Sequence, residues 1–404
     1  MKEKILNKKF NFFYVKNFFN KFFTLFNKFR CSKKLTRVFF ILLTSSLFLL
    51  VFINREKLSP DNIIESVQEC FSDFGAGRNF PYDVSDFKID NQNFKAIGKN
   101  IVFISDMDFV YLNSNAKEIS KRKHSFSNPV LKSNNNKLLL FDSYNRSFEI
   151  GTMSNTFFKK SLNDDILTGN IASNGTYAFV TKAKGFLGKL EAFKNKKDAR
   201  FFEYFFSDSY ITDLTFSLDG KKCACVGLNS NLGELVSSLF IFNCLNSEPT
   251  LKVDFNKSVI FNIKYLNGKN IAIVGDNIFS IVDTGNGKRK DYYFSNKILT
   301  SYCITDDKIL LSLSLSDDGD NCEILIFNKN GDLENTIKTD LKIKSLSYKF
   351  NKIAALSYGV VYIYNNKGKL ITSFECSKDA KKIEFLASKQ IYVLSLSEIK
   401  KFSF

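Results

Sequence analysis

Short hydrophobic runs separated by polar turns recur along the chain beyond Pro81. The clearest repeating element is a hydrophobic run that follows a polar turn, and eight copies lie 37–48 residues apart. Short apolar runs bounded by Gly, Asn and Asp are typical of β-strands, and this period is typical of propeller blades. The eight runs begin at Ile101, Leu138, Tyr177, Cys223, Ile271, Ile309, Ile353 and Ile391.

Each run has further strand-like neighbours. A partner strand precedes it, often through a tight turn such as Asp219-Gly220, because glycine readily adopts positive φ. A third strand such as Leu239–Asn243 follows, and a second turn leads to a fourth. The eighth copy ends at the C-terminus without a fourth strand. We therefore expect Tyr82–Ile89, which has no other partner, to complete that last blade and leave no open edge.

The repeat predicts an all-β fold: a β-propeller of eight four-stranded blades over residues 81–404. A seven-bladed or irregular ring is the alternative, because the blade count depends on short strands. A transmembrane helix and a cytoplasmic amphipathic tail are expected to precede the propeller.

A transmembrane helix is predicted over residues 35–54. Val38–Ile53 is a run of sixteen uncharged residues flanked by Arg37 and Arg55. It is slightly short for a bilayer, but flanking basic side chains can reach the interface. The alternatives are a buried core helix or a cleaved signal peptide. No small-residue cleavage site follows, which favours an uncleaved signal anchor.

The tail over residues 1–34 is basic and rich in Phe. Up to Arg37 the chain has eleven Lys and Arg against one acidic residue, so +10 of the net charge of +17 lies there. This places the N-terminus in the cytoplasm and the propeller outside. On a helical wheel Phe19, Phe22 and Phe26 share one face opposite a basic face, which predicts a helix in the headgroup layer. A disordered tail and a helix for a cytoplasmic partner are the alternatives.

Residues 55–80 are predicted to form a stalk helix and linker. Ser59 and Pro60 supply a helix start, and Gly75 and Gly77 supply the stop. The basic residues lie beside the hydrophobic segment instead of on a folded face, so the charge indicates a membrane partner and no nucleic acid.

The composition disfavours several kinds of chemistry. His124 is the single histidine, so a Ser-His-Asp or Cys-His arrangement would need that one residue. No CxxC pair occurs, so no metal is expected, and the absence of Trp argues against a quinoprotein cofactor. The eight cysteines lack disulfide-framework spacing and are interpreted as mostly small buried thiols.

Polar residues on the innermost strands are the candidate ligand-binding residues, because those strands line the channel of a propeller. They are Asp213, Asn262, Ser301 and Lys344. A glycosidase needs two carboxylates beside one bond, and Asp213 is the single carboxylate among these candidates. The alternative is that these side chains are solvated or make hydrogen bonds between blades.

Four segments carry a resemblance to a known family: HSFSNPVLK (124–132), SYITDLTFSLDGKKCACVGL (209–228), GRNFPYDV (77–84) and the C-terminal SLSEIKKFSF. The chain resembles membrane-anchored, propeller-like proteins of unknown function from low-GC Gram-positive bacteria. The resemblance implies the anchor, the orientation and a propeller of WD-repeat-like or quinoprotein-like type. It implies no activity and no catalytic residue, and the Phe-rich tail departs from it.

The sequence therefore predicts a non-catalytic binding or scaffolding module at the cell envelope, with an envelope protein or polymer as partner. Two alternatives stay open: an extracellular enzyme acting on carbohydrate or peptide, and a sensor that transmits ligand binding to the tail.

Overall fold

The computed structural model describes residues 44 and 45, 77, 79–152, 156–194, 199–246, 248–266 and 268–404. Within this part of the chain, no helix is both long and apolar enough to span a bilayer. The predicted transmembrane helix (35–54), the tail with Phe19, Phe22 and Phe26, and the flanking Arg37 and Arg55 lie outside the described residues, apart from Thr44 and Ser45. The stalk lies outside as well, except for its last residues.

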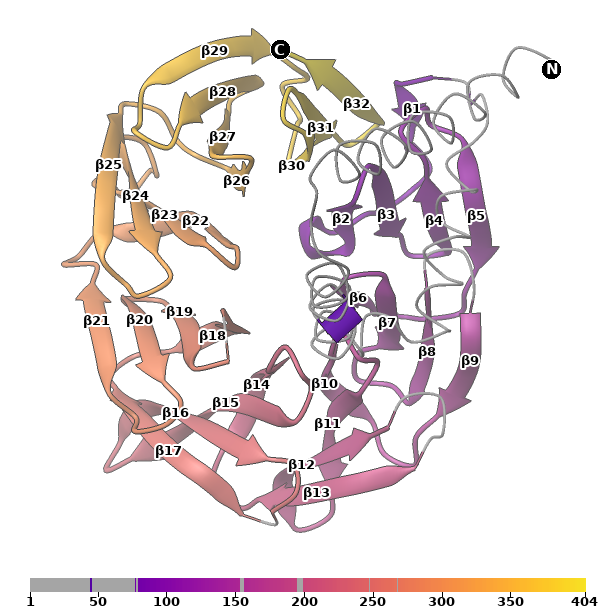
Figure 1. Ribbon diagram of the computed structural model, residues 1–404, viewed down its shortest axis with the longest axis vertical. Coiled ribbons are helices and arrows are strands. Elements are labelled where there is room, and N and C mark those ends of the chain that lie inside the picture. The colour runs from indigo at the N-terminus through magenta and orange to yellow at the C-terminus, as the bar shows by residue number, and fades with distance from the viewer. Residues whose placement is uncertain are drawn as a thin grey trace, which may run out of the picture. The chain divides into compact units, whose positions relative to one another are not determined.

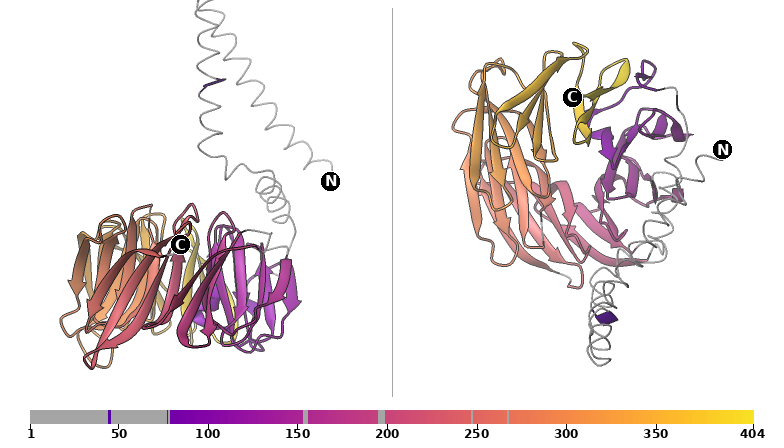
Figure 2. Two further views of the ribbon diagram at one scale, coloured as in Figure 1. Left: turned by 90° about the horizontal axis from the view of Figure 1, so that it is seen from below. Right: turned by 45° about the horizontal axis from the view of Figure 1, so that its top comes forward.

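The described residues form eight antiparallel four-stranded sheets arranged as the blades of a propeller (Figure 1). In each blade the first strand is nearest the centre and the fourth is at the rim. Seen from the side, the blades form a disc (Figure 2). The prediction of eight four-stranded blades is confirmed, and the seven-bladed alternative is wrong.

The blades are numbered in chain order. Blade 1 consists of β2 (Phe94–Ile97), β3 (Asn100–Ile104), β4 (Asp108–Leu112) and β5 (Glu118–Lys123), and blade 2 of β6 (Pro129–Asn134), β7 (Lys137–Asp142), β8 (Ser147–Thr152) and β9 (Thr156–Ser161). Blade 3 consists of β10 (Ile166–Ile171), β11 (Tyr177–Ala183), β12 (Phe186–Phe193) and β13 (Arg200–Phe206), and blade 4 of β14 (Tyr210–Phe216), β15 (Lys222–Asn231), β16 (Glu234–Asn243) and β17 (Pro249–Asn256). Blade 5 consists of β18 (Ile260–Tyr265), β19 (Asn270–Gly275), β20 (Ile278–Asp283) and β21 (Arg289–Tyr293), and blade 6 of β22 (Ile298–Ile304), β23 (Lys308–Ser314), β24 (Cys322–Asn328) and β25 (Leu333–Thr339). Blade 7 consists of β26 (Ser345–Lys349), β27 (Lys352–Ser357), β28 (Val360–Asn365) and β29 (Leu370–Glu375), and blade 8 of β30 (Lys382–Ala387), β31 (Gln390–Leu394), β32 (Glu398–Ser403) and β1 (Tyr82–Asp83).

The ring closes where sequence reasoning placed the closure. β1 pairs antiparallel with β32, with Tyr82 opposite Ile399, so the N-terminal strand is the fourth strand of blade 8. The paired strand has two residues, shorter than the Tyr82–Ile89 segment that was expected. Val84 instead buries its side chain between blades 8 and 1, and the short helix η1 (Asn91–Asn93) leads into β2.

The eight repeated hydrophobic runs are the second strands of the blades. All residues of β3 and β7 are buried, because a second strand has a neighbouring strand on each side and a neighbouring blade on each face. The outer strands alternate between exposed and partly buried residues, as in β17. Position within the blade therefore explains why the second strands give the strongest sequence signal.

The core is divided among the contacts between blades. Eight clusters of buried apolar side chains from the described residues each join two consecutive blades. Cys223 and Cys225 of β15 both face blade 3, and Cys244 packs with them. Cys223, Cys225, Cys244 and Cys322 are buried free thiols, as predicted for cysteines in the propeller. Cys31 and Cys70 lie outside the described residues.

The propeller has two unlike faces. We call the face where the first strands begin the upper face; it also carries the turns between second and third strands. The lower face carries the turns between first and second strands and between third and fourth strands. Gly77 packs so closely on the β4–β5 turn of the lower face that a Cβ would overlap the carbonyl of Asn115. Gly77 therefore lies at the lower face.

Candidate functional site

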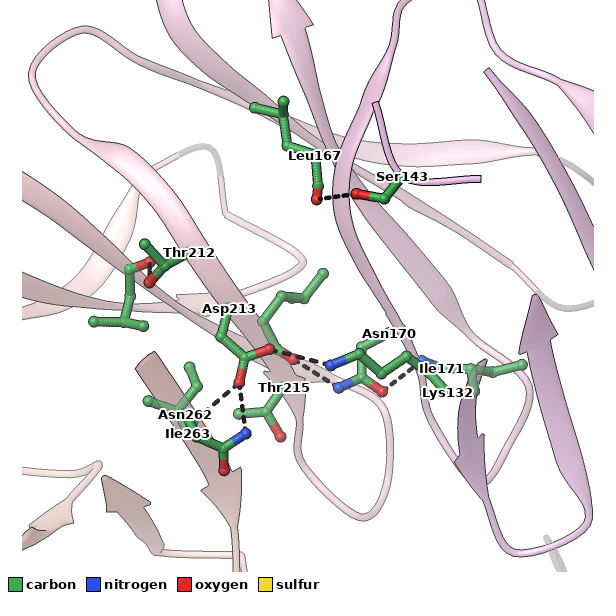
Figure 3. A network of polar contacts seen from close by, with 12 residues as sticks. Lys132, Ser143, Leu167, Asn170, Ile171, Thr212, Asp213, Thr215, Asn262 and Ile263 are labelled. Carbon is green, nitrogen blue, oxygen red and sulfur yellow. Dashed lines mark hydrogen bonds and ion pairs between the residues drawn. The ribbon is translucent and has the colours of Figure 1, made fainter. Parts of the chain in front are cut away.

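Asp213 is the centre of a polar network on the channel side of the blades (Figure 3). Its Oδ1 lies 3.4 Å from Lys132 Nζ of blade 2. Its Oδ2 accepts hydrogen bonds from the Ile263 backbone N–H (3.0 Å) and from Asn262 Nδ2 (3.3 Å), both of blade 5. Both carboxylate oxygens of this buried residue are therefore already engaged by the protein.

The same bonding recurs elsewhere with a hydroxyl in place of the carboxylate. In blade 7, Ser345 and Ser347 accept hydrogen bonds from the backbone N–H groups of Ile383 and Phe385 in blade 8, both at 3.3 Å. First strands have one free edge toward the channel, so their N–H groups need such partners. The network around Asp213 is thus a joint between blades. This is the structural alternative that the sequence left open for this residue.

Ser301 and Lys344 lie at a different place from Asp213 and Asn262. Both line a cavity of about 410 Å³ on the upper face, which we call the upper-mouth cavity. Ser301 is on β22, and Lys344 is in the loop just before β26. Two of the four predicted residues therefore belong to the joint between blades, and the other two line the upper-mouth cavity.

Sequence reasoning missed the lysines of the first strands. The eight first strands carry five lysines, Lys95, Lys132, Lys264, Lys349 and Lys382, against two carboxylates, Asp213 and Glu384. The signal was a lysine inside an otherwise apolar or neutral strand, as in FKAI (94–97) and IFNIKY (260–265). This pattern did not stand out because the chain has many lysines.

Two of these lysines, Lys95 and Lys349, have a side-chain ammonium group with no hydrogen-bond or ion-pair partner among the described residues. Burial is the largest cause that lowers the pKa of Lys95, and together with the nearby charges of Lys132, Lys382 and Lys264, which Glu384 opposes, it brings the pKa to about 7. A lysine of a first strand that has no carboxylate paired with it indicates that the channel has a positive potential.

His124 is committed to backbone contacts. Its Nε2 lies 3.1 Å from the carbonyl oxygen of Ser105, and its Nδ1 accepts a hydrogen bond from the N–H of Phe126 (3.2 Å). Burial lowers the pKa of His124. The arrangement fits a neutral imidazole with the proton on Nε2, and both nitrogens are occupied. Within the part of the chain that the structure describes, no group of three or more His, Cys, Asp or Glu side chains could hold a metal ion.

The upper face exposes a series of large apolar side chains. In six of the eight blades, the described turn between second and third strands presents one of them to solvent, and in blade 3 the first residue of β12, directly after this turn, does so. They are Met107, Tyr144, Phe186, Leu232, Leu315, Tyr358 and Leu396. We call these the upper-turn residues. Among the described residues, the first–second and third–fourth turns of the lower face together expose three large apolar residues, Leu218, Leu245 and Phe350.

Three upper-turn residues also have an unfavourable backbone conformation. Tyr144, Leu232 and Tyr358 have φ of 63°, 52° and 40°, in the left-handed region. Asn, Asp or Gly costs less there, especially in two-residue turns such as Leu232-Gly233. Leu232 is 99% exposed, so burial does not explain its presence. Turn geometry does not favour these bulky side chains, and of the three only Tyr358 makes a side-chain hydrogen bond or ring contact within the described residues, donating a hydrogen bond to Asp320 Oδ1 (3.2 Å) and lying beside Lys344.

The geometry defines an eight-bladed β-propeller with an apolar upper face and a basic channel. Within this class, the chain belongs to DUF5711, a family of unknown function whose model matches residues 82–403. No curated protein matches the sequence. The family match covers the whole propeller, in keeping with the predicted resemblance to propeller-like proteins of unknown function.

Solved structures share the fold at low sequence identity. BamB from Moraxella catarrhalis is 11% identical, with a TM-score of 0.51 over 80% of this chain and 100% of that chain. Sqt1 from Saccharomyces cerevisiae is 12% identical, with a TM-score of 0.52 over 82% and 100%. The C-terminal WD40 domain of Sif2 is 13% identical, with a TM-score of 0.56 over 79% and 99%. These likenesses concern the fold alone, which is consistent with a binding or scaffold module.

Proposed function

We propose that the chain is a non-catalytic binding module, and that its upper face binds a protein partner at the cell envelope. The observation that carries the proposal is the set of exposed upper-turn residues in seven of eight blades. Exposed apolar side chains gathered on one face are typical of protein interfaces, where aromatic residues and Met are enriched. The positive φ at Tyr144, Leu232 and Tyr358 adds support, because the chain retains bulky residues where smaller ones would be more stable.

The proposal includes the predicted membrane anchor. Residues 35–54 hold the chain in the membrane with the N-terminus in the cytoplasm and the propeller outside. The support is the uncharged run Val38–Ile53 and the +10 charge that precedes it.

The docking surface is tested by changes that favour the turns but remove the apolar side chains. Leu232→Asn and Tyr358→Asn place a residue that tolerates positive φ at both positions, which offsets the loss of the exposed Tyr358 hydrogen bond to Asp320, so folding stability should change little. We expect cross-linking in intact cells followed by pull-down to recover a protein partner with the wild-type chain. Recovery should fall by about tenfold with the double variant, since such anchors dominate interface energies.

Leu218→Asn is the matched control, because Leu218 is an exposed leucine of a lower-face turn. It should leave partner recovery unchanged. Equal recovery by the double variant and by wild type would contradict docking at the upper turns.

The orientation predicts a protease result. Protease added to cells with an accessible surface should cut the propeller region, whereas inside-out vesicles should protect it. A tag at the N-terminus should behave in the opposite way. Cleavage of the propeller in inside-out vesicles, together with protection in intact cells, would contradict the proposed location.

A further inference from the structure

The two mouths of the channel differ in charge. The lower-mouth cavity, of about 840 Å³, contains both signs, because Asp306, Asp307 and Glu384 line it together with Lys264 and Lys349. The upper-mouth cavity is lined by three lysines, Lys344, Lys381 and Lys382, and by no carboxylate among its described lining residues. Charge therefore distinguishes the upper mouth as a site for an anion.

The lysines of the upper mouth are only partly satisfied by the protein. Lys381 Nζ donates to the carbonyl oxygen of Ile89 (2.6 Å), and Lys382 Nζ lies 3.4 Å from Glu384. The ammonium group of Lys344 has no hydrogen-bond or ion-pair partner among the described residues, and its Nζ lies 5.4 Å from the centre of the Tyr358 ring. Because Lys344 is exposed, its ammonium protons face solvent and are open to a ligand.

The channel below strengthens this positive field. Lys95 also lacks a partner among the described residues, and Lys132, Lys264 and Lys382 contribute to the charge around it. Charges of one sign lining a concave, weakly polarisable wall add together and attract the opposite charge from solvent. Asp90 and Asp379 offset part of the charge of Lys381, and Glu384 offsets part of the charge of Lys382. Lys344 is therefore the main candidate for ligand contact, and Lys382, with one carboxylate paired to it, is the second.

The neutral part of the cavity wall suggests what the anion is attached to. Thr300, Ser301, Asn91 and Gln92 supply hydroxyl and amide groups. Phe261 and Tyr302 lie with ring centres 5.9 Å apart on the same wall, and both line the cavity. Hydroxyls, amides and an aromatic surface are suited to the polar edges and apolar faces of a sugar or polyol.

We propose that the upper-mouth cavity binds a phosphate ester of a sugar or polyol, with Lys344 and Lys382 as the phosphate contacts. Several lysines on separate elements suit a phosphate, which carries up to two negative charges and accepts bonds from several directions. Phe261 and Tyr302 would pack against the body of the ligand. The site is distinct from the upper-turn residues apart from the contact of Lys344 with Tyr358, and it does not depend on the proposed protein partner.

Calorimetric titration of the full-length chain, purified in detergent, tests the site. The probes are glucose 6-phosphate, inorganic phosphate, glucuronate and glucose. We expect glucose 6-phosphate to bind, phosphate to bind more weakly and glucose not to bind. Lys344→Gln with Lys382→Gln should weaken glucose 6-phosphate binding by about tenfold or more, because two charge-assisted bonds are lost. Added salt should weaken it as well.

Lys349→Gln is the matched control, since Lys349 is on the same blade as Lys344 but lines the lower mouth. It should change the affinity by less than about twofold. Above about pH 7, where the phosphate ester is already a dianion, binding should also weaken as Lys95 loses its proton, and Lys95→Met should reduce that dependence.

Three results would overturn the proposal. They are no binding of glucose 6-phosphate, binding of glucuronate in its place, and equal affinity in the double lysine variant and wild type. Thermal unfolding of each variant shows whether it is folded. Because no protein partner is present, failure here leaves the proposed docking face untouched, and loss of partner recovery leaves the phosphate site untouched.

Discussion

Replacing Asp213 with alanine is expected to lower the free energy of unfolding by about 2–4 kcal/mol. The carboxylate accepts hydrogen bonds from the N–H of Ile263 and from Asn262, and it pairs with Lys132. Alanine leaves a buried N–H without an acceptor and Lys132 without its counter-charge. The chain has no Trp whose fluorescence could report unfolding, so chemical denaturation followed by circular dichroism measures the loss of stability.

Asp213→Asn is the informative companion. An amide oxygen can still accept from Ile263, so this variant should lose less stability than Asp213→Ala, and the difference measures the ionic part of the joint. Asp306→Ala, at an exposed carboxylate of the lower mouth, should cost little. An Asp213→Ala variant as stable as wild type would show that the joint contributes nothing. Loss of a substrate turnover in that stable variant would instead favour the enzyme alternative.

Replacing Lys95 with methionine is expected to stabilise the chain by about 1–3 kcal/mol at neutral pH, because methionine keeps the aliphatic length and removes the charge. The pKa of Lys95 is about 7 in the folded chain, against an ordinary value of about 10.4 in the unfolded chain. Between these values the unfolded chain binds one more proton, so the stability of wild type rises with pH across this window. Below about pH 7 both states are protonated and the full cost of the charge is present.

The gain from Lys95→Met should therefore be largest at or below about pH 7 and fade toward about pH 10. Denaturation midpoints of both chains at several pH values test this. Lys349→Met, at the lower mouth, should show no such trend. A gain that is the same at every pH would mean that packing, and not charge, is responsible. A bound phosphate ester would reduce the gain, since it would compensate Lys95 in the wild-type chain.

Particular residues show how far the sequence predicted the fold. The runs that begin at Ile101 and Leu138 are strands buried on both faces, and their composition reports that burial directly. The last blade lacked a fourth strand in the sequence, and an unpaired edge strand is unfavourable, so the segment at Tyr82 was predicted to complete it. The pairing of Tyr82 with Ile399 confirms this closure. The length of that closure was wrong, since Val84, Phe87 and Ile89 pack between blades 8 and 1 instead of continuing the strand.

The candidate site was predicted less completely. Asp213 and Asn262 were named as channel residues, and they do meet, but as a joint between blades 4 and 5. Ser301 and Lys344 were named without any sign that they share a cavity. The upper-turn residues and Lys95 were missed, because single exposed apolar residues and single lysines look ordinary in a chain of this composition.

The sequence by itself determined the class of fold, the number of blades and the way the ring closes, because these follow from local alternation and from a period that each blade repeats. Only the tertiary structure decided which side chains act together. Lys132 and Asp213 are 81 residues apart in the chain, and the upper-turn residues come from seven separate blades. Closing the ring brings the same position of every blade to one face and every first strand to one channel, and no local pattern records that convergence.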